Sequence, residues 1–344
     1  MRSFVRSSVA AAAVVVTVLG GLALAQRPVR AGESLAREGE LPVYGIPGLG
    51  EAAEFYFSPD SGSIIGNAKR EGDASHQVYT ATLDGKQIRR ISDGAQTACS
   101  YYFPDGKRLL WTSTRDWPNL PPGNWSDPRD YPKGAELYTS DLEGKDIKRL
   151  TNNQLYEAEA SVSPDGQWIL FGRQIDGKMD LWRMRPDGSG EQQITKTPEW
   201  QEGGAFYMPD GETIITRAWR VEDEAIERAR PMQLFTVKHD GTGLKQVTHD
   251  EGMHWAPYPA PDGKHVAYVR LAPPRNFDVY LRNLETGEEK QLTRYDGFDG
   301  FPSFSPDGRW MAFASSRENK PGERTLRTYV MDVSSLGLGR MALK

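Results

Sequence analysis

A tight turn containing Pro-Asp recurs six times and constrains the fold more than any other feature of the sequence. The turns read FSPDSG, FPDGK, SPDGQ, MPDGE, APDGK and SPDGR, and their aspartates are Asp60, Asp105, Asp165, Asp210, Asp262 and Asp307. Proline suits the second position of such a turn, glycine suits the fourth, and the aspartate side chain can bond nearby backbone groups. A run rich in β-branched or aromatic residues follows each turn, as in RLLWTS and WMAFAS. Each repeat therefore begins as a strand, a tight turn and a second strand.

A second repeated block follows each of these hairpins. Blocks of equal length, each ending in Thr or Ser, occupy residues 78–92, 137–151, 181–195, 234–248 and 279–293, and a degenerate sixth block lies at 328–342. An apolar strand, a glycine turn and a short second strand make each block a β-hairpin. Two hairpins per repeat and a commonest spacing of 45 residues between turn aspartates are typical of a β-propeller blade. We predict an all-β fold, a six-bladed β-propeller of four-stranded antiparallel blades, over residues 41–344.

Two segments could close the ring by completing the last blade. Residues 41–46 (LPVYGI) precede the first turn by the distance at which the outer strand ends in the other repeats. Residues 337–343 align at that position by length as well. The sequence leaves both alternatives open, and we favour closure by the N-terminal segment.

The first 25 residues have the pattern of a secretory signal. Arg2 and Arg6 precede an uncharged apolar run that ends in Ala23-Leu24-Ala25, a small-residue cleavage pattern. The run contains two glycines and makes a poor membrane span, so a retained anchor helix is the weaker alternative. We expect residues 1–25 to be removed and residues 26–40 to form a flexible leader. The mature protein is then periplasmic or secreted, with no stable membrane insertion.

Charge and cysteine content exclude two further classes of protein. The formal net charge is −5, which lacks the basic excess of nucleic-acid binders, so no nucleic-acid partner is expected. Cys99 is the only cysteine, so no intramolecular disulfide can form. We interpret Cys99 as a buried small residue, because a nucleophilic thiol would need a basic partner.

Several blade starts resemble the repeats of TolB-like propellers. They include CSYYFPDGKRLLWTSTR (99–115), YEAEASVSPDG (156–166) and FDGFPSFSPDG (298–308), and the resemblance covers about residues 41–342. The resemblance implies the propeller fold strongly and the function weakly, because propellers host many functions. TolB itself carries an α/β domain ahead of its propeller and works in the Tol–Pal envelope system. Residues 26–40 are too few for that domain, so the resemblance does not imply a Tol–Pal role.

One register of the repeat collects ionisable residues where the connections between blades meet the central channel. The residues eight positions before the turn aspartates are Ala52, Thr97, Glu157, Glu202, His254 and Asp299, with Glu54, Cys99 and Glu159 nearby. Carboxylates and an imidazole could hold a divalent cation, which makes the last four of these six residues candidate metal ligands. The alternatives are a site for a cationic or polar ligand, and a solvated mouth whose carboxylates pair with arginines.

Other candidates on this face are arginines at the ends of the second strands and tryptophans in the connections. The predicted ligand-binding set is Glu157, Glu202, His254, Asp299, Glu159, Trp255, Trp200, Arg115, Arg217 and Arg317. Surface aromatic side chains beside carboxylates favour recognition of glycans or peptides. The alternative is that the tryptophans pack long loops onto the blades. Two such loops are the Pro-rich residues 114–134 and residues 218–233, where we predict a short helix from Val221 to Ala229.

These features favour an exported, non-catalytic recognition propeller that binds an envelope or extracellular protein, peptide or glycan on this funnel-like face. One alternative is a metal-assisted polysaccharide lyase or hydrolase with acid–base residues in the funnel. Another is an accessory propeller that serves a separate peptidase. The sequence contains no G-x-S-x-G, H-E-x-x-H or Walker motif. No cofactor is firmly predicted, and a divalent cation in the funnel is the one candidate.

The mature protein is expected to lack residues 1–25. Intact-mass measurement on material exported by cells that express the whole chain should give the mass of a chain starting at Gln26. Exported material that still begins at Met1 would contradict the secretory signal.

Overall fold

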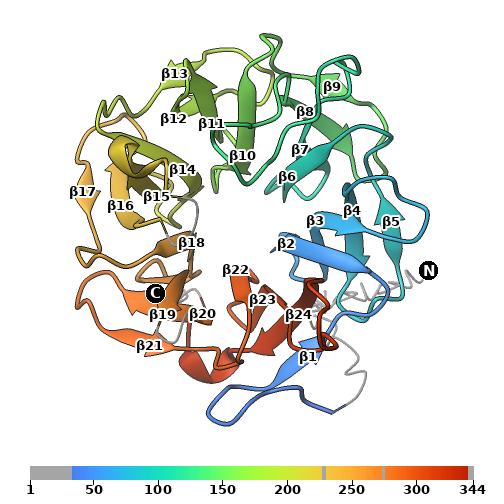
Figure 1. Cartoon of the computed structure of the whole chain (residues 1–344), viewed down its shortest axis with the longest axis vertical. Coiled ribbons are helices and arrows are strands. Elements are labelled where there is room, and N and C mark those ends of the chain that lie inside the picture. Colours follow the sequence, from blue (N-terminus) through green and yellow to red (C-terminus); the bar gives the residue numbers. More distant parts are fainter. Residues whose placement is uncertain (1–32, 227–229, 273–275, 340–344) are drawn as a thin grey trace, which may run out of the picture.

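The computed structural model describes residues 33–226, 230–272 and 276–339, so the predicted signal and residues 26–32 lie outside it. Six four-stranded antiparallel sheets surround a central axis as the blades of a propeller (Figure 1). The predicted all-β, six-bladed architecture is confirmed. Among the residues described, no helix is both long and apolar enough to cross a membrane.

The strands of each blade run outward from the channel in chain order, except in the last blade. Blade 1 comprises β2 (Glu51–Phe57), β3 (Ser63–Lys69), β4 (Gln77–Thr82) and β5 (Ile88–Arg90). Blade 2 comprises β6 (Thr97–Tyr102), β7 (Arg108–Ser113), β8 (Glu136–Asp141) and β9 (Lys148–Arg149). Blade 3 comprises β10 (Tyr156–Val162), β11 (Ile169–Ile175), β12 (Lys178–Met184) and β13 (Gln192–Gln193).

The second half of the ring repeats this pattern. Blade 4 comprises β14 (Trp200–Tyr207), β15 (Thr213–Arg220), β16 (Gln233–Lys238) and β17 (Lys245–Gln246). Blade 5 comprises β18 (His254–Pro259), β19 (His265–Ala272), β20 (Asn276–Asn283) and β21 (Glu289–Gln291). Blade 6 comprises β22 (Asp299–Phe304), β23 (Trp310–Ser315), β24 (Arg327–Asp332) and, as its outer strand, β1 (Val43–Gly45).

The Pro-Asp turns join the first two strands of each blade, and their aspartates are structural as predicted. Asp105 Oδ1, for example, accepts the backbone N–H of Lys107 at 2.8 Å. In five of the turns a glycine with a positive φ follows the aspartate, such as Gly106 with 65°, which glycine adopts without steric strain, and in the first turn Ser61 takes this place with 61°. These turns define the turn face of the propeller, and the connections between blades define the opposite connection face.

Every innermost strand carries a β-bulge at the same place. The pairing with the second strand shifts register between Ala53 and Tyr56 in blade 1, and at equivalent positions in all other blades. One residue of each bulge has a left-handed backbone with φ between 48° and 58°: Glu54, Cys99, Glu159, Gly204, Ala256 and Phe301. A bulge re-aims the side chains around it, so it decides which residues face the channel.

Four aromatic side chains from the innermost strands meet across the channel. Tyr56 and Phe206 come from opposite blades, and their ring centroids lie 5.4 Å apart. Tyr101 and Tyr258 also come from opposite blades, and their hydroxyl oxygens lie 3.0 Å apart. Contacts between opposite blades require the side chains to fill the channel at this depth. The channel is therefore closed by an aromatic cluster, and each face has its own separate mouth.

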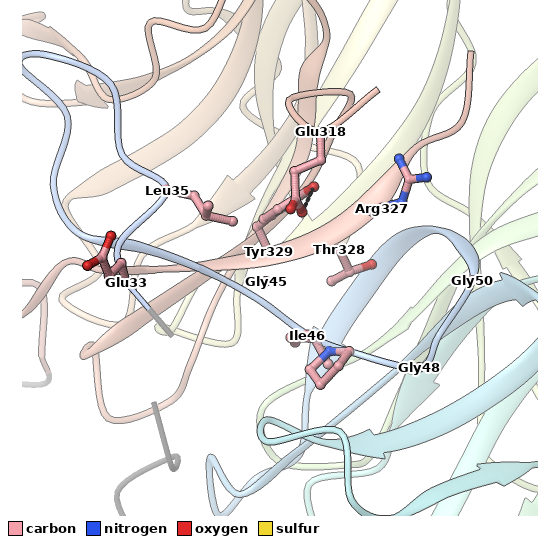
Figure 2. A pocket seen from close by; sticks show the side chains of 11 residues that line it. Glu33, Leu35, Gly45, Ile46, Gly48, Gly50, Glu318, Arg327, Thr328 and Tyr329 are labelled. Carbon is pink, nitrogen blue, oxygen red and sulfur yellow. Dashed lines mark hydrogen bonds between the residues drawn. The ribbon is translucent and has the colours of Figure 1, made fainter. Parts of the chain in front are cut away.

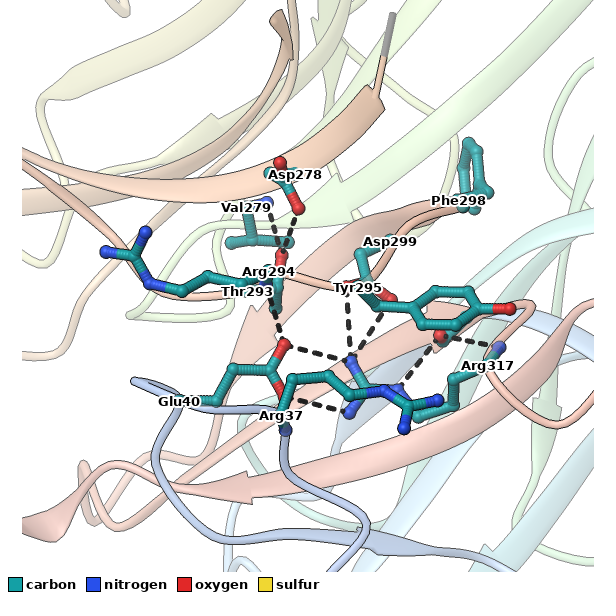
Figure 3. Close-up of polar contacts among 12 residues, drawn as sticks. Arg37, Glu40, Asp278, Val279, Thr293, Arg294, Tyr295, Phe298, Asp299 and Arg317 are labelled. Atoms are coloured by element: carbon teal, nitrogen blue, oxygen red, sulfur yellow. Dashed lines mark hydrogen bonds and ion pairs between the residues drawn. The ribbon is translucent and has the colours of Figure 1, made fainter. Parts of the chain in front are cut away.

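The N-terminal segment closes the ring, as we favoured from the sequence. β1 pairs antiparallel with β24, with Val43 opposite Met331. The side chain of Glu40 is fully buried and pairs with the guanidinium of Arg317 at 3.2 Å (Figure 3). Arg317 also binds Asp299 at 3.1 Å, so one buried arginine joins the N-terminal segment to the innermost strand of blade 6.

Two expectations are corrected in detail. The flexible leader predicted for residues 26–40 does not extend over residues 33–40, because Leu35 bonds Val43 and the Glu40 carboxylate is buried against Arg317. The predicted helix from Val221 to Ala229 is reduced to a single 3₁₀ turn, Val221–Asp223. Residues 227–229 of that prediction lie outside the described residues. The preceding strand β15 continues to Arg220, which leaves little chain for a helix.

Truncation tests the closure of the ring. A chain that starts at Pro47 should have a free energy of unfolding more than about 3 kcal/mol below that of a chain starting at Glu33, because breaking a buried ion pair alone has this magnitude. The truncation also exposes the edge of β24. Urea denaturation of both chains measures the difference. Equal stabilities would contradict closure by β1.

Candidate functional site

The four ionisable residues of the predicted ring lie between blades and do not face an open mouth. The side chains of Glu157, Glu202, His254 and Asp299 are at most 2% exposed. Each ring residue is among the first three residues of an innermost strand, and Thr97 and Glu202 contact the Ser or Thr that ends the preceding blade. Ser92 Oγ, for example, lies 3.1 Å from Thr97 Oγ1 and accepts the N–H of Val78 at 2.9 Å. The ring register therefore joins neighbouring blades.

Two carboxylates of the ring pair with arginines, as the third alternative anticipated. Arg173 Nε donates to Glu157 Oε1 at 2.5 Å, and Arg173 Nη1 pairs with Glu191 at 2.7 Å. Asp299 pairs with Arg317 in the closing blade, as Figure 3 shows. Burial raises the pKa of Asp299 to about 6, although the arginine opposes this shift. These ion pairs are internal, so neither carboxylate is available to a ligand.

The other two ring residues are buried without a charged partner of comparable strength. Glu202 accepts hydrogen bonds from Thr197 and, at 3.2 Å, from Thr195. Burial raises the pKa of Glu202 to about 8, and the nearby Asp180 carboxylate contributes to the rise. His254 Nδ1 lies 3.1 Å from the carbonyl oxygen of Met232, and burial lowers the pKa of the imidazole. Both groups favour their neutral forms.

The structure does not bring the four candidate metal ligands together. Within the part of the chain that is described, no three His, Cys, Asp or Glu side chains are grouped closely enough to hold a metal ion. The physical reason is that Glu157, Glu202, His254 and Asp299 belong to four separate blade junctions. Cys99 is buried, as predicted, and burial raises the pKa of its thiol well above the usual value.

A pocket opens on the connection face above the aromatic cluster, between blades 1, 2 and 3. Its volume is about 470 Å³, and β2, β6 and β10 supply its inner wall (Figure 1). The side chains that matter most to its chemistry are Glu54, Asn67, Cys99, Trp125, Tyr156 and Glu159. Three of these, Glu54, Cys99 and Glu159, are the left-handed bulge residues of consecutive blades. The bulge register, two positions after the ring register, supplies the channel-facing residues.

The two glutamates of this pocket differ in their charge balance. Glu159 Oε1 pairs with Arg217 at 2.7 Å, and Glu159 Oε2 accepts the N–H of Gly204 at 2.6 Å. Glu54 accepts one hydrogen bond from the Tyr56 hydroxyl and one from the Asn67 amide, both at 3.1 Å. Burial raises the pKa of Glu54 to about 7, and the Glu159 carboxylate adds to the rise. Glu54 can therefore hold or release a proton near neutral pH.

The Pro-rich loop, residues 114–134, forms the outer wall of the pocket. Tyr131 of this loop stacks on Tyr156 at a centroid distance of 4.0 Å, and Trp125 packs on the same ring at 5.9 Å. Gln174 fixes the loop further by donating to the carbonyl oxygen of Pro128 at 2.8 Å. Trp125 is only partly buried and lines the pocket, so it is the tryptophan best placed to touch a ligand.

A second cavity of about 460 Å³ continues from this pocket along the same loop. The two cavities share Gln96, and the second is lined by Arg115, Trp117 and several prolines. Trp117 donates to Glu136 Oε1 at 3.3 Å and stacks with Arg149, so most of this ring packs the loop. The two cavities adjoin at Gln96, and we refer to them together as the groove. Such a groove suits an extended ligand better than a compact one.

The remaining predicted residues mainly pack the fold. Trp200 lies edge-on to Phe235, and Trp255 lies edge-on to Phe301 at 4.6 Å. Trp219 is 1% exposed. These tryptophans therefore pack the connections onto the blades. Trp125 and, in part, Trp117 are the tryptophans that are placed to recognise a ligand.

Two other cavities are weaker candidates. Figure 2 shows one of about 430 Å³ beside β1 at the outer edge of blade 6. Two of its charged side chains have partners already, since Tyr329 donates to Glu318 at 2.7 Å and Arg327 pairs with Glu323 at 2.6 Å. The other cavity is the mouth on the turn face, where seven prolines surround the aromatic cluster without a charged group among the lining residues.

Sequence reasoning identified Glu159 as a candidate and noted Glu54, but it missed Asn67 and Tyr156. The residues of the bulge register share no common side chain, so only the spacing of two from the ring register could have indicated them. Asn67 comes from β3 and reaches Glu54 across the blade, a pairing that depends on the bulge. Arg217 was predicted as a ligand-binding residue and instead neutralises Glu159.

Comparison with known proteins supports the fold and gives distant relatives. The family model of the TolB beta propeller domain, PD40, matches residues 216–343. An uncharacterized protein of Agrobacterium fabrum is 28% identical over 63% of this chain and 69% of its own length. Dipeptidyl-peptidase 5 of Porphyromonas endodontalis is 25% identical over 66% of this chain, which spans 38% of that enzyme. A crystallised TolB-type protein of Agrobacterium tumefaciens is 21% identical, with a TM-score of 0.57 over 81% of this chain and 89% of that one.

Glu202 and Glu136 are both buried, but their pKa values shift in opposite directions. We therefore predict opposite changes in stability when each is replaced by glutamine. Glu202 keeps its proton in the folded state up to about pH 8, whereas the unfolded chain releases it near the ordinary pKa of 4.5. Its presence therefore lowers stability progressively as pH rises from about 4.5 to 8. Glu202→Gln should raise the free energy of unfolding at pH 8 by more than about 1 kcal/mol, with a smaller gain at pH 5.

Glu136 is the matched control, because its side chain is equally buried but well supplied with donors. Burial raises the pKa of Glu136, but Thr151, backbone N–H groups and Arg149 outweigh it, so the net shift is downward. The stability from such a group is present above the unfolded pKa and is lost as pH falls. Glu136→Gln should destabilise the protein at pH 7 by about 1–3 kcal/mol, measured by urea denaturation. The same sign for both variants would contradict this assignment.

Proposed function

Because the chain is a six-bladed β-propeller of the TolB type, we propose that it is an exported recognition protein that binds an extended peptide on its connection face. The observation that carries the proposal is the groove formed by the channel pocket and the adjoining cavity. The groove is closed below by the aromatic cluster, and its walls are Glu54, the Pro-rich loop and Tyr156. A ligand can therefore enter from one face only and lie along the groove.

Several features favour a peptide over a glycan. The groove presents hydroxyl and amide side chains from Ser75, Gln96, Asn124 and Ser126, which match the alternating donors and acceptors of a peptide backbone. Exposed aromatic platforms for sugar rings are scarce among the described residues of the groove, because Trp117 and Tyr156 are engaged in packing. The peptidase among the relatives, which this chain matches only in part, supports peptide handling as well.

The proposed partner is a flexible segment of a periplasmic or extracellular protein, reached after removal of the predicted signal. The same groove could serve as a docking site for a separate peptidase, which would present its substrate along the loop. Both versions require the same first step, the capture of an extended chain between Glu54 and the Pro-rich loop. The proposal does not require a metal ion or another cofactor.

Catalysis is a second candidate function because of Glu54. A carboxyl group with a pKa of about 7 is suited to proton transfer at neutral pH, and the Glu159 carboxylate lies close enough to influence it. This candidate differs from the alternative of a metal-assisted lyase or hydrolase, whose proposed ligands are buried at separate junctions. Incubation of captured peptides with the protein, followed by mass spectrometry, separates the two functions. Intact peptides support recognition, and new fragments support hydrolysis.

Replacement of Trp125 tests the groove. Pooled random decapeptides are passed over the immobilised protein, and the retained peptides are quantified by mass spectrometry. Trp125→Ala should reduce retention at least tenfold, because it removes an aromatic wall from the pocket. Trp168→Ala is the matched control, since Trp168 is also partly buried but follows a turn on the opposite face and stacks with Arg185 at 3.8 Å. Equal loss in both variants, or no retention by the native protein, would contradict the proposal.

A further inference from the structure

The corner of the pocket around Glu54 contains hydrogen-bond acceptors with unused capacity. Both oxygens of Glu54 accept a single hydrogen bond, from Tyr56 and from the Asn67 amide nitrogen. A carboxylate oxygen can accept a second bond, so each retains free capacity. Asn67 Oδ1 is buried and has no hydrogen-bond partner within the described part of the chain. A buried polar atom without a partner is unfavourable unless something outside the chain supplies one.

The charge of this corner is also incomplete. Arg217 neutralises Glu159, but no basic side chain in the described ranges forms an ion pair with Glu54. Glu54 lies at the inner end of the groove, on the left-handed bulge of β2, where the aromatic cluster closes the channel. A group that enters here must donate hydrogen bonds and is favoured further if it carries positive charge. An ammonium group offers both, with three donors around one compact charge.

Building on the proposed peptide recognition, we propose that this corner binds a primary ammonium group of the peptide, with Glu54 as counter-ion and Asn67 Oδ1 as a hydrogen-bond acceptor. The ammonium group belongs either to the N-terminus of the peptide or to a lysine side chain. The closed inner end of the groove suits a chain terminus or an extended side chain. The rest of the peptide then lies along the Pro-rich loop.

Binding of an ammonium group must also change the protonation of the pocket. Near neutral pH the Glu54 carboxyl is partly protonated, and a cation beside it favours the ionised form. The other ionisable groups that face it are Glu159 and its partner Arg217, the Tyr56 hydroxyl, the Cys99 thiol and, at the rim of the pocket, His76. Burial raises the pKa of Glu54 to about 7, so its carboxyl should release protons when an ammonium group binds at pH 6.

The test uses three forms of the random decapeptide pool on the immobilised mature protein. The first form has free amines. The second is acetylated at the N-terminus but keeps unmodified lysine side chains. The third is acetylated at the N-terminus and at its lysine side chains. The third form should be retained at least tenfold less than the first. If the second form behaves like the first, lysine is the source of the ammonium group, and if it behaves like the third, the N-terminus is the source. Retention of the third form equal to that of the first would overturn the inference and leave peptide recognition intact.

Two variants separate a role in binding from a role in folding. Glu54→Gln should reduce retention of amine-bearing peptides at least tenfold, and its melting temperature should be equal to or above that of the native protein, because a buried acid is removed. Glu318→Gln is the matched control, since Glu318 also accepts a tyrosine hydroxyl, at 2.7 Å, in the cavity of Figure 2. It should leave retention unchanged. Unchanged retention in Glu54→Gln would overturn the inference.

Calorimetry on one retained peptide gives an independent readout. Titrations at pH 6 in phosphate and in a buffer of high ionisation enthalpy should show net proton release for the native protein and none for Glu54→Gln. Proton release of equal size in both proteins would overturn the role of Glu54. If no form of the pool is retained by the native protein, peptide recognition itself fails, and the ammonium site fails with it. These outcomes distinguish the two failures.

Discussion

Each innermost strand contains one residue more than its partner can pair with, and the position of the site follows from this constraint. In a regular strand, residues two apart lie on the same face of the sheet. Glu157 and Glu159 are two apart, yet Glu157 is buried at a blade junction and Glu159 is partly exposed to the channel. The register shift lies between Ala158 and Ser161, and Glu159 itself has the left-handed backbone of the bulge, which aims its side chain toward the axis. Repeated six times, this defect separates a ring of structural residues from a ring of channel-facing ones.

The fold could be predicted because the same Pro-Asp turn occurs in every repeat. The turns at Asp60 and Asp307, in the first and last repeats, therefore indicate a pair of strands as clearly as the turns between them. Closure by residues 41–46 was predictable from spacing alone, although the burial of Glu40 against Arg317 was not, since they lie at opposite ends of the sequence. The site was harder to predict, because the bulge has no residue preference: its positions hold Glu, Cys, Gly, Ala and Phe. Counting from the turn aspartates therefore identified Glu157 instead of Glu159 as the leading candidate.

Buried charges at the blade junctions specify how the blades meet more than they stabilise the fold. A buried ion pair often adds little net stability, because removing the charges from water offsets the attraction between them. Separating the charges of these pairs would instead leave a buried charge without a partner, which is costly. The pairs are Arg173 with Glu157, and Arg317 with Asp299 and Glu40. In the closing blade, this requirement recruits the N-terminal segment, since Arg317 has buried acceptors on both sides only when Glu40 is in place. The ring is thus completed by a polar contact as well as by β1.

The same physics of buried charge constrains which ligands the groove can accept. The aromatic cluster excludes water from below, and an acid that enters the pocket would lie beside Glu54 and Glu159 in an environment that screens repulsion poorly. Ligands that carry carboxylates at every unit, such as acidic polysaccharides, would meet this repulsion at the inner end of the groove. A ligand with one cationic group instead pairs with the Glu54 carboxylate. Part of its binding energy then comes from relief of the unfavourable desolvation of that carboxylate in the free protein. The proposed selectivity for charge therefore follows from a half-buried bulge residue that forms no ion pair among the residues described.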